Sequence, residues 1–552
     1  MRILIQLTIL SFIVTACSAQ QKNQKTAITD PSGSTKLVVG ITIDQLRYEL
    51  LLRFWDDFES DGFKKLVNEG FIFRNHHYDY APTFTGPGHA SIYTGTSPAH
   101  HGIIANDWFD RKSGTMHYCA SDTSVKSIGA VSSGGQMSPH RMVSSTFTDQ
   151  LRLASNKRSK VFGISMKDRG AILPAGHTPN AAYWFLGKNE GKWISSSWYM
   201  NELPSWVIQF NAKNLPEQYL SQTWSPLKSD DVYDESLTDN NAYESPFKGT
   251  AKAAFPYNLA DLRALNGDYE LIKSTPWGNT LTVDFAKALI ENESLGTDEF
   301  VDVLAMSFSS TDYAGHQFGP MAKETQDVYL RLDRDLADFV NYLDTQIGKN
   351  NYLLFITADH GGSDVPSHFK SLDIPAGYYK SSVMEDAVED RLSALYGIGD
   401  YVQNVSNEQV FFNRTTLTNK KLNLEDISTN AIEALLELPG IWTAVPASAM
   451  RNNDFSNDYL SLVQDGFYPT RSGDIVCIFE PSWIEYGFTG STHGSVYSYD
   501  THVPLIFYGN GINKGETHRK TQIRDIAPTL SAILKIAQPN ACTGLPLPEV
   551  IK

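Results

Sequence analysis

The feature that most constrains this fold is a long helix between two apolar strands. Residues 301–308 (VDVLAMSF) and 352–357 (YLLFIT) are short apolar runs, typical of strands buried on both faces. Residues 322–347 between them carry apolar side chains at helical spacing, and a strand, helix and strand in this order predict a parallel crossover. With a third apolar run at residues 36–44 (KLVVGITID), we expect an α/β fold with a doubly wound, mostly parallel sheet flanked by helices.

Two stretches interrupt this alternation of strands and helices. Residues 183–290 are rich in Trp, Tyr, Asn and Pro and begin with what we expect to be an aromatic hairpin. Residues 364–457 mix short helices and strands, and further strands are expected at 474–479 and 503–508. We interpret both stretches as insertions that roof the functional site of one domain, residues 36–552. A separate second domain is the alternative.

The first twenty residues are typical of an export signal. A short basic start precedes an apolar run at residues 3–14, which is too short to cross a bilayer. The run ends in Val-Thr-Ala-Cys17, which is similar to a bacterial lipobox. We expect a signal peptide at residues 1–16, a lipid anchor on Cys17 and a flexible tether at 17–35; ordinary secretory cleavage after residue 19 is the alternative. Either route predicts a periplasmic or outer-membrane-anchored protein.

Charge and cysteine content narrow the possible partners. The 552 residues include 46 Lys+Arg and 62 Asp+Glu, a net charge of −16, so nothing favours nucleic-acid binding. An anionic substrate would need metal ions or a few locally placed cations. No two of the four cysteines have CxxC spacing, and at most one disulfide can form if the first is lipidated; they are Cys17, Cys119, Cys477 and Cys542. We expect a monomer, since no arm or interface helix is apparent.

Metal-ligating side chains gather at or just after the ends of the predicted strands, where ligand sites of doubly wound sheets lie. They comprise three Asp and three His: Asp44, Asp312, His316, Asp359, His360 and His493. Each alone has a structural explanation as a turn, cap or helix-surface residue. Together they supply the oxygen and nitrogen ligands that Zn²⁺ accepts, in a number that suits two ions.

A candidate nucleophile lies in the segment 81–90 (APTFTGPGHA). Thr85 is a good N-cap, and Pro87 suits the first turn of a helix that we expect at residues 88–93. The helix N-terminus would face an anion beside the Thr85 hydroxyl. A hydroxyl has to be deprotonated to attack, and a bound zinc would do this without a base. A purely structural role for Thr85 as the cap of the helix is the alternative.

These motifs resemble the alkaline phosphatase superfamily, and most of all its monomeric, phosphate-irrepressible bacterial enzymes with a threonine nucleophile. The pieces occur in the order of the family: ITIDQ with Asp44, TFTGPGH with Thr85, HGIIANDW with Asn106, SSTDYAGH with Asp312 and His316, TADHGG with Asp359 and His360, and GSTHGS with His493. The similarity runs from about Ile41 to the segment ending at Pro546. Large dimeric relatives use Ser in place of Thr and have a third, Mg²⁺ site that is not evident here.

The resemblance implies a role for each of these residues. One Zn²⁺ would be held by Asp312, His316 and His493. A second would be held by Asp44, Asp359 and His360, with the Thr85 oxygen as fourth ligand. Asn106 would donate a hydrogen bond to a phosphoryl oxygen, and Lys167 and Arg169 in SMKDRG match the basic pair of the phosphatase branch.

This basic pair favours phosphate monoesters as substrates. A monoester dianion has three non-bridging oxygens, of which Arg169 could bind those left free by the metals and Asn106, while Lys167 adds charge. A diester carries one charge less and must place a second organic group there. Sulfatases require a Cys/Ser-x-Pro-x-Arg motif that is absent here, and the cofactor-independent phosphoglycerate mutases use Ser.

We therefore expect hydrolysis of monoesters to alcohol and phosphate through a phospho-Thr85 intermediate, with two metals clamping the attacking and leaving oxygens. A phosphodiesterase or nucleotide pyrophosphatase of the same superfamily is the main alternative. An inactive, metal-containing surface binding protein is the second. The leaving group stays open: Trp184 and Trp193 could touch it or could only pack the hairpin.

Overall fold

The computed structural model describes residues 35–456 and 458–551, and its centre is one mixed sheet. The described strands of this sheet run in the order β20-β2-β19-β12-β1-β11-β6-β7-β8-β5, with β21 paired to β2. Their bounds are β1 (Leu37–Ile43), β2 (Phe71–His77), β5 (Ser127–Ile128), β6 (Val161–Ser165), β7 (Ala181–Leu186), β8 (Lys192–Ser196), β11 (Asp302–Phe308), β12 (Tyr352–Thr357), β19 (His502–Gly509), β20 (Gly515–Thr517) and β21 (Thr521–Gln522).

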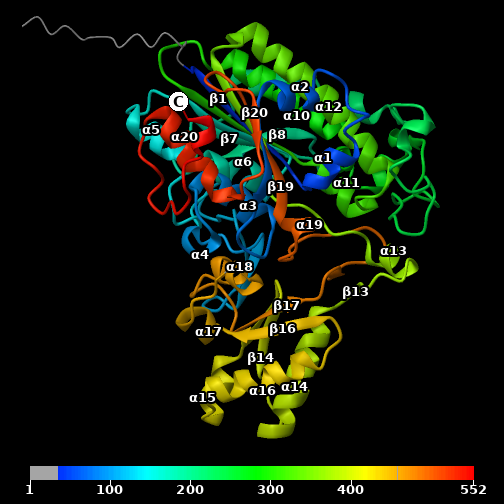
Figure 1. Ribbon diagram of the computed structural model, residues 1–552, viewed down its shortest axis with the longest axis vertical. Coiled ribbons are helices and arrows are strands. Elements are labelled where there is room, and N and C mark those ends of the chain that lie inside the picture. Colours follow the sequence, from blue (N-terminus) through cyan, green and yellow to red (C-terminus); the bar gives the residue numbers. More distant parts are fainter. Residues whose placement is uncertain (1–34, 457, 552) are drawn as a thin grey trace, which may run out of the picture.

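The predicted parallel crossover forms the middle of this sheet. Strand β1 pairs in parallel with β11 on one side and β12 on the other, and all three strands are fully buried. The helix predicted between them is α12 (Lys323–Leu343), which packs with α10 (Trp277–Asn292). A second group of helices, α3 (Thr85–Thr94), α6 (Asp168–Ala175) and α20 (Ile526–Leu534), flanks the sheet as well (Figure 1). The predicted fold class is therefore confirmed.

The sheet is not parallel throughout. Strand β19, predicted at residues 503–508, pairs antiparallel with both β12 and β2. The aromatic hairpin predicted at the start of 183–290 is β7 and β8, which pair antiparallel, and β7 continues the parallel sheet from β6. This hairpin therefore extends the sheet, whereas we expected it to roof the functional site. Its rings are core residues: Trp184 is 2 % and Trp193 1 % exposed. Neither indole is therefore available to a leaving group.

A second, smaller sheet forms with its own apolar core, and we call residues 377–484 the cap and the rest the body. Four strands run in the order β14-β15-β17-β16, covered by helices on one side (Figure 1). The elements are α14 (Ser381–Tyr396), β14 (Val402–Ser406), β15 (Gln409–Phe412), α15 (Arg414–Lys420), α16 (Leu424–Leu436), β16 (Ile441–Pro446) and β17 (Ile475–Phe479). The strand expected at 474–479 thus belongs to the cap, beyond the insertion boundary predicted at 457.

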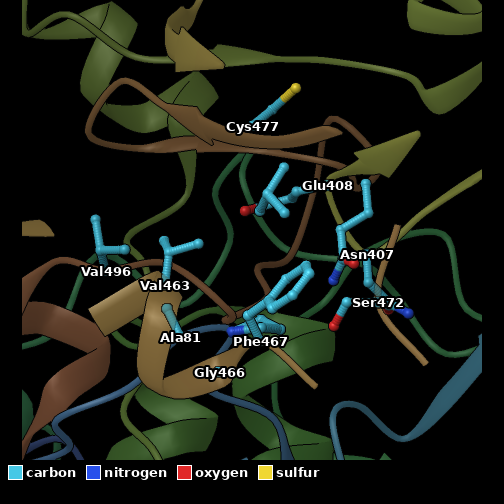
Figure 2. A pocket seen from close by; sticks show the side chains of 12 residues that line it. Ala81, Asn407, Glu408, Val463, Gly466, Phe467, Ser472, Cys477 and Val496 are labelled. Carbon is cyan, nitrogen blue, oxygen red and sulfur yellow. The ribbon is translucent and has the colours of Figure 1, made fainter. Parts of the chain in front are cut away.

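The cap meets the body at two neighbouring strands, at one close helix contact, and through side-chain contacts such as the ion pair of Arg111 with Asp474. Strands β13 (Gly377–Tyr378) and β18 (Trp483–Ile484), where the chain enters and leaves the cap, pair in parallel. Helix α18 (Tyr459–Gly466) ends so close to Ala81 that a Cβ on Gly466 would overlap its carbonyl oxygen. Beside this contact lies a cavity of ≈ 10 Å³, room for about one water, with Glu408 over it in the view of Figure 2.

The predicted signal peptide, Cys17 and nearly all of the tether lie outside the described residues. Among the described cysteines, Cys119, Cys477 and Cys542 are all free thiols. No helix in the described part of the chain combines the length and the apolar character needed to cross a membrane.

Candidate active site

Three neighbouring strands deliver the carboxylates to one edge of the sheet. Asp44 directly follows β1, Asp359 follows β12, and Asp312 lies in the first turn of α11 (Ser310–Phe318), which begins just after β11. Because these strands are parallel and adjacent, their carboxyl ends meet. All three side chains are buried, at 0 to 2 % exposure.

The first group of donor atoms comes from Asp44, Asp359 and His360, all within 4.8 Å of one another. The His360 Nε2 atom lies 3.5 Å from Asp44 Oδ1 and 3.5 Å from Asp359 Oδ2. The Thr85 hydroxyl oxygen is 3.4 Å from the same Nε2. These are the four residues expected at one metal.

The second group is centred on Asp312. Its Oδ1 atom lies 3.2 Å from His316 Nε2 and 3.7 Å from His493 Nε2. The rings of His360 and His493 stack at 3.5 Å, and His360 also lies within 4.8 Å of the Asp312 and His493 donor atoms. The two groups therefore adjoin, with His360 between them.

Each histidine is held with Nε2 directed into the site. The Nδ1 atoms donate to backbone carbonyls: His316 to Ser491 at 2.8 Å, His360 to Gly361 at 2.9 Å, and His493 to Thr83 at 2.7 Å. A donor bond at Nδ1 fixes the tautomer and leaves the Nε2 lone pair for a metal.

The charge state of these groups also suits cations. Burial lowers the pKa of the His360 imidazole and lowers that of His493 still further, so both stay neutral ligands. Burial, followed by the nearby Asp312 and Asp359, raises the pKa of Asp44 well above its ordinary value. Asp44 Oδ1 and Asp359 Oδ2 are buried without a hydrogen-bond donor. A cation would satisfy both atoms, so the residues present fit metal ions.

Thr85 stands at the start of α3, whose predicted beginning at residue 88 is too late. The helix begins at Thr85 itself, with Phe84 as its N-cap, and no side chain caps it. Thr85 was expected as the cap, but its Oγ1 atom makes no bond to the helix backbone and faces His360 and Arg169. The hydroxyl thus lies beside free N–H groups and the metal-ligand cluster.

Asn106 lies against the first turn of α3. Its Oδ1 atom accepts a hydrogen bond of 2.8 Å from the backbone N–H of Gly86, the residue after Thr85. This bond orients the side-chain amide, and no described residue accepts from its N–H₂ group. The predicted phosphoryl donor is therefore next to the candidate nucleophile.

Lys167 and Arg169, at the start of α6, both reach the site. The Lys167 ammonium is 2.6 Å from Asp44 Oδ2 and 2.5 Å from Asp312 Oδ2, so it bridges the two donor groups. Burial opposes its charge, but these two carboxylates raise its pKa above the ordinary value. Arg169 Nη2 lies 3.4 Å from the Thr85 hydroxyl oxygen. Asp168 between them accepts from Tyr118, the same hydroxyl that accepts from Arg169.

Sequence reasoning missed the residues that hold these groups in place. Tyr118 accepts a 3.1 Å hydrogen bond from Arg169 Nη1. Gln45 donates to Asp312 from its side chain at 2.9 Å and to Asp359 from its backbone at 3.1 Å. His89 lies 2.9 Å from the Thr85 carbonyl and 3.3 Å from Asp359. Gln45 and His89 stand inside the quoted motifs, whereas Tyr118 has no local signal.

Comparison with known proteins agrees with this geometry. Residues 38–500 match the family model of type I phosphodiesterases and nucleotide pyrophosphatases. A protein of Myroides odoratus named calcium-transporting ATPase is 44 % identical over 94 % of this chain and 95 % of its own length. Alkaline phosphatase PhoV of Synechococcus elongatus is 42 % identical, over 99 % of this chain and all of its own.

A solved structure supports the same grouping. Alkaline phosphatase PafA of Elizabethkingia meningoseptica is 41 % identical over 94 % of each chain. A crystal structure of wild-type PafA superposes with a TM-score of 0.90 at 41 % identity, covering 95 % of this chain and all of that one. The chain therefore belongs to the type I phosphodiesterase/nucleotide pyrophosphatase family and, within it, to the alkaline phosphatases.

Proposed function

We propose that the chain hydrolyses phosphate monoesters to an alcohol and inorganic phosphate through a phospho-Thr85 intermediate. The observation that carries this is the placement of Arg169, whose guanidinium lies 3.4 Å from the Thr85 hydroxyl. A fixed guanidinium beside the nucleophile can bind two oxygens of a transferred phosphoryl group.

Two Zn²⁺ ions would complete the site. Asp312, His316 and His493 would hold one, and Asp44, Asp359, His360 and the Thr85 oxygen the other; oxygen and imidazole nitrogen ligands suit this ion. When bound, such ions lower the pKa of a hydroxyl or water and stabilise charge on attacking and leaving oxygens.

The side chains of the site then have separate roles in the reaction. The Thr85 oxygen attacks phosphorus in line with the leaving alcohol, and water later attacks the phosphothreonine and releases phosphate. Asn106 donates its amide N–H to one phosphoryl oxygen while Arg169 binds others. Lys167, already among carboxylates, balances the negative charge that enters the site with the substrate.

Substrate class follows from the number of cations that face the phosphoryl group. Arg169 and Lys167 suit the dianion of a monoester, whereas a diester would present an organic group to Arg169. The terminal phosphoryl group of ATP is held by an anhydride bond, but like a monoester it presents three non-bridging oxygens and about two negative charges. The name of the Myroides relative therefore makes ATP a substrate to include. Phosphodiesterase activity is the alternative that the same assay decides.

The test compares p-nitrophenyl phosphate, bis-p-nitrophenyl phosphate and ATP with zinc-loaded protein. We expect a strong monoester preference in the wild type. Thr85→Ala should lower monoester turnover by about 1000-fold or more and form no phosphoprotein under acid quench. Thr85→Ser, the matched control, keeps an alcohol and should retain both. A diester preference would contradict the proposal, as would an active Thr85→Ala variant.

Export, the lipid anchor on Cys17 and a monomeric state remain part of the proposal, as does a single domain over residues 36–552 with insertions at about 183–290 and 364–457. The apolar run 3–14 and the lipobox-like Cys17 support export. Labelling with radioactive palmitate, lost in Cys17→Ser, tests the anchor.

A further inference from the structure

A second, larger cavity lies where the cap meets the body. Its volume is ≈ 660 Å³, within the range of pockets that hold small organic ligands. Six aromatic side chains line it: Tyr378, Tyr379, Phe479, Trp483, Tyr486 and Phe488. None of them is required by the metal-ligand groups described above, so the concentration of rings needs its own explanation.

The inner wall of this cavity is rigid. Trp483 lies on Gly377 and Gly440, and a Cβ at either position would overlap the indole ring. Tyr379 stacks on Phe479 with ring centres 3.6 Å apart and planes within 13°. Rings fixed in this way lose little conformational entropy when they contact a ligand.

The outer wall is apolar and open to solvent. Phe488 is 78 % exposed and meets the Tyr378 ring edge-on at 5.1 Å. The Phe488 carbonyl accepts hydrogen bonds from Ser367 and from the Tyr378 hydroxyl, at 2.8 and 3.1 Å. Together with the other rings of the cavity, Phe488 forms a continuous apolar surface that a ligand could contact.

One residue connects the cavity to the candidate active site. Tyr486 lines the cavity, and its ring stacks on His316 with centres 5.8 Å apart and planes at 20°. On the other side, His316 Nε2 is 3.2 Å from Asp312. The cavity therefore begins one ring beyond the donor group of Asp312, His316 and His493, the group that does not include the attacking Thr85 oxygen.

Positive charge lies at the rim of this cavity. Lys370 and Lys380 both line it, and no described carboxylate pairs with either ammonium. The Lys370 Nζ atom lies 5.8 Å from the centre of the Tyr378 ring. In a chain of net charge −16, two such cations favour the approach of an anionic substrate from this side.

We propose that this cavity is a leaving-group subsite that binds the planar aromatic part of a phosphate monoester, such as an aryl or nucleoside group. The proposal rests on the phosphatase function above and adds a substrate class to it. Tyr486 and Phe488 would contact the ring while the phosphoryl group faces Thr85. Because the ring lies away from the reacting atoms, binding it should lower KM and leave kcat nearly unchanged.

A matched pair of substrates tests the subsite without changing the reacting alcohol. Adenosine 5′-phosphate and ribose 5-phosphate share the same primary alcohol, and only the first carries an aromatic base. We expect kcat/KM to favour adenosine 5′-phosphate by about tenfold through KM, as for base stacking on a protein ring. We also expect adenosine to inhibit competitively.

Phe488→Ala is the test variant, because Phe488 is highly exposed and does not contact a metal-ligating residue. It should bring adenosine 5′-phosphate down to the level of ribose 5-phosphate, abolish inhibition by adenosine, and leave ribose 5-phosphate turnover unchanged. Trp442→Ala, which removes a half-exposed ring of the cap outside the cavity, should keep the preference.

Equal kcat/KM for the two substrates in the wild type would overturn the subsite while leaving the phosphatase function intact. A preference that persists in Phe488→Ala would overturn it as well. If the zinc-loaded wild type failed to hydrolyse ribose 5-phosphate and p-nitrophenyl phosphate alike, the phosphatase function itself would fall, and the subsite with it.

Discussion

The body and the cap differ in how their functional groups are encoded. In the body, Asp44, Asp312 and Asp359 come at or just after the ends of adjacent parallel strands, so the fold brings them together. In the cap, the aromatic wall draws on β13 and β18, which are separated by about one hundred residues of chain. The difference indicates that the chemistry depends on compact motifs, whereas contact with the substrate depends on tertiary packing.

The largest expected effect tests the body at the point where its two donor groups adjoin. His360 supplies Nε2 near both groups, so His360→Ala should lower kcat/KM by at least about 1000-fold and reduce bound metal at both positions. His316 belongs to one group and is 27 % exposed at its side chain. His316→Ala should therefore lose less metal. Elemental analysis of the purified proteins measures this, and equal losses would contradict a shared His360.

A smaller effect is expected when a residue that binds the phosphoryl group, and not a metal ligand, is changed. Arg169→Ala should lower kcat/KM for p-nitrophenyl phosphate by about 100-fold and change that for the bis-p-nitrophenyl diester little. Tyr118→Phe removes only the hydroxyl that accepts from Arg169 and should show the same selectivity with a smaller loss. Equal damage to both substrates would mean that Arg169 does not distinguish monoesters from diesters.

The smallest effect concerns the cap, where a change should alter stability far more than chemistry. Burial raises the pKa of Glu408 to about 8, and its carboxylate accepts a 3.3 Å hydrogen bond from Tyr379. A raised carboxyl pKa means that the folded state binds the extra proton. The resulting stability is complete below the ordinary glutamate pKa of about 4.3 and is lost as the pH rises through 8, on the order of 5 kcal/mol.

Glu408→Gln should remove that pH dependence. Thermal unfolding between about pH 5 and 9 should show a smaller fall in Tm than in the wild type, and the variant should be the more stable protein at the alkaline end of this range. Glu437→Gln, at an exposed position of the cap, should follow the wild-type curve. Parallel curves for wild type and Glu408→Gln would show that the Glu408 carboxyl has an ordinary environment.

The sequence predicted the centre of the fold because buried strands and a long amphipathic helix have strong local patterns. It could not predict that β19 runs antiparallel, since a fully buried strand has the same apolar pattern in either direction. The aromatic composition of the β7–β8 hairpin suggests that it roofs the site. In the structure, however, those rings are buried in the apolar clusters that cover the sheet.

The residues of the candidate site also differ in whether the sequence predicts them. Thr85, Asn106 and the metal-ligating residues lie in short motifs, and the structure brings all of them together. Tyr118 reaches Arg169 across 51 positions, and Tyr486, just after the chain leaves the cap, reaches His316 on α11. Contacts of this kind arise only from three-dimensional packing, and a single sequence carries no periodic signal for them.

The pairing of β13 with β18 has a consequence for how such a protein can change. The backbone N–H of Gly377 bonds to the Ser482 carbonyl at 3.1 Å, and that of Tyr379 to Ile484 at 3.1 Å, so the two ends of the cap lie side by side. A module with adjacent ends can be exchanged for another of different length if the replacement keeps the contacts with the body, such as that of Gly466 with Ala81. Gene-level replacement of residues 377–484 would then give catalysts with the same reactive centre and new substrate ranges, a modularity open to both evolution and protein engineering.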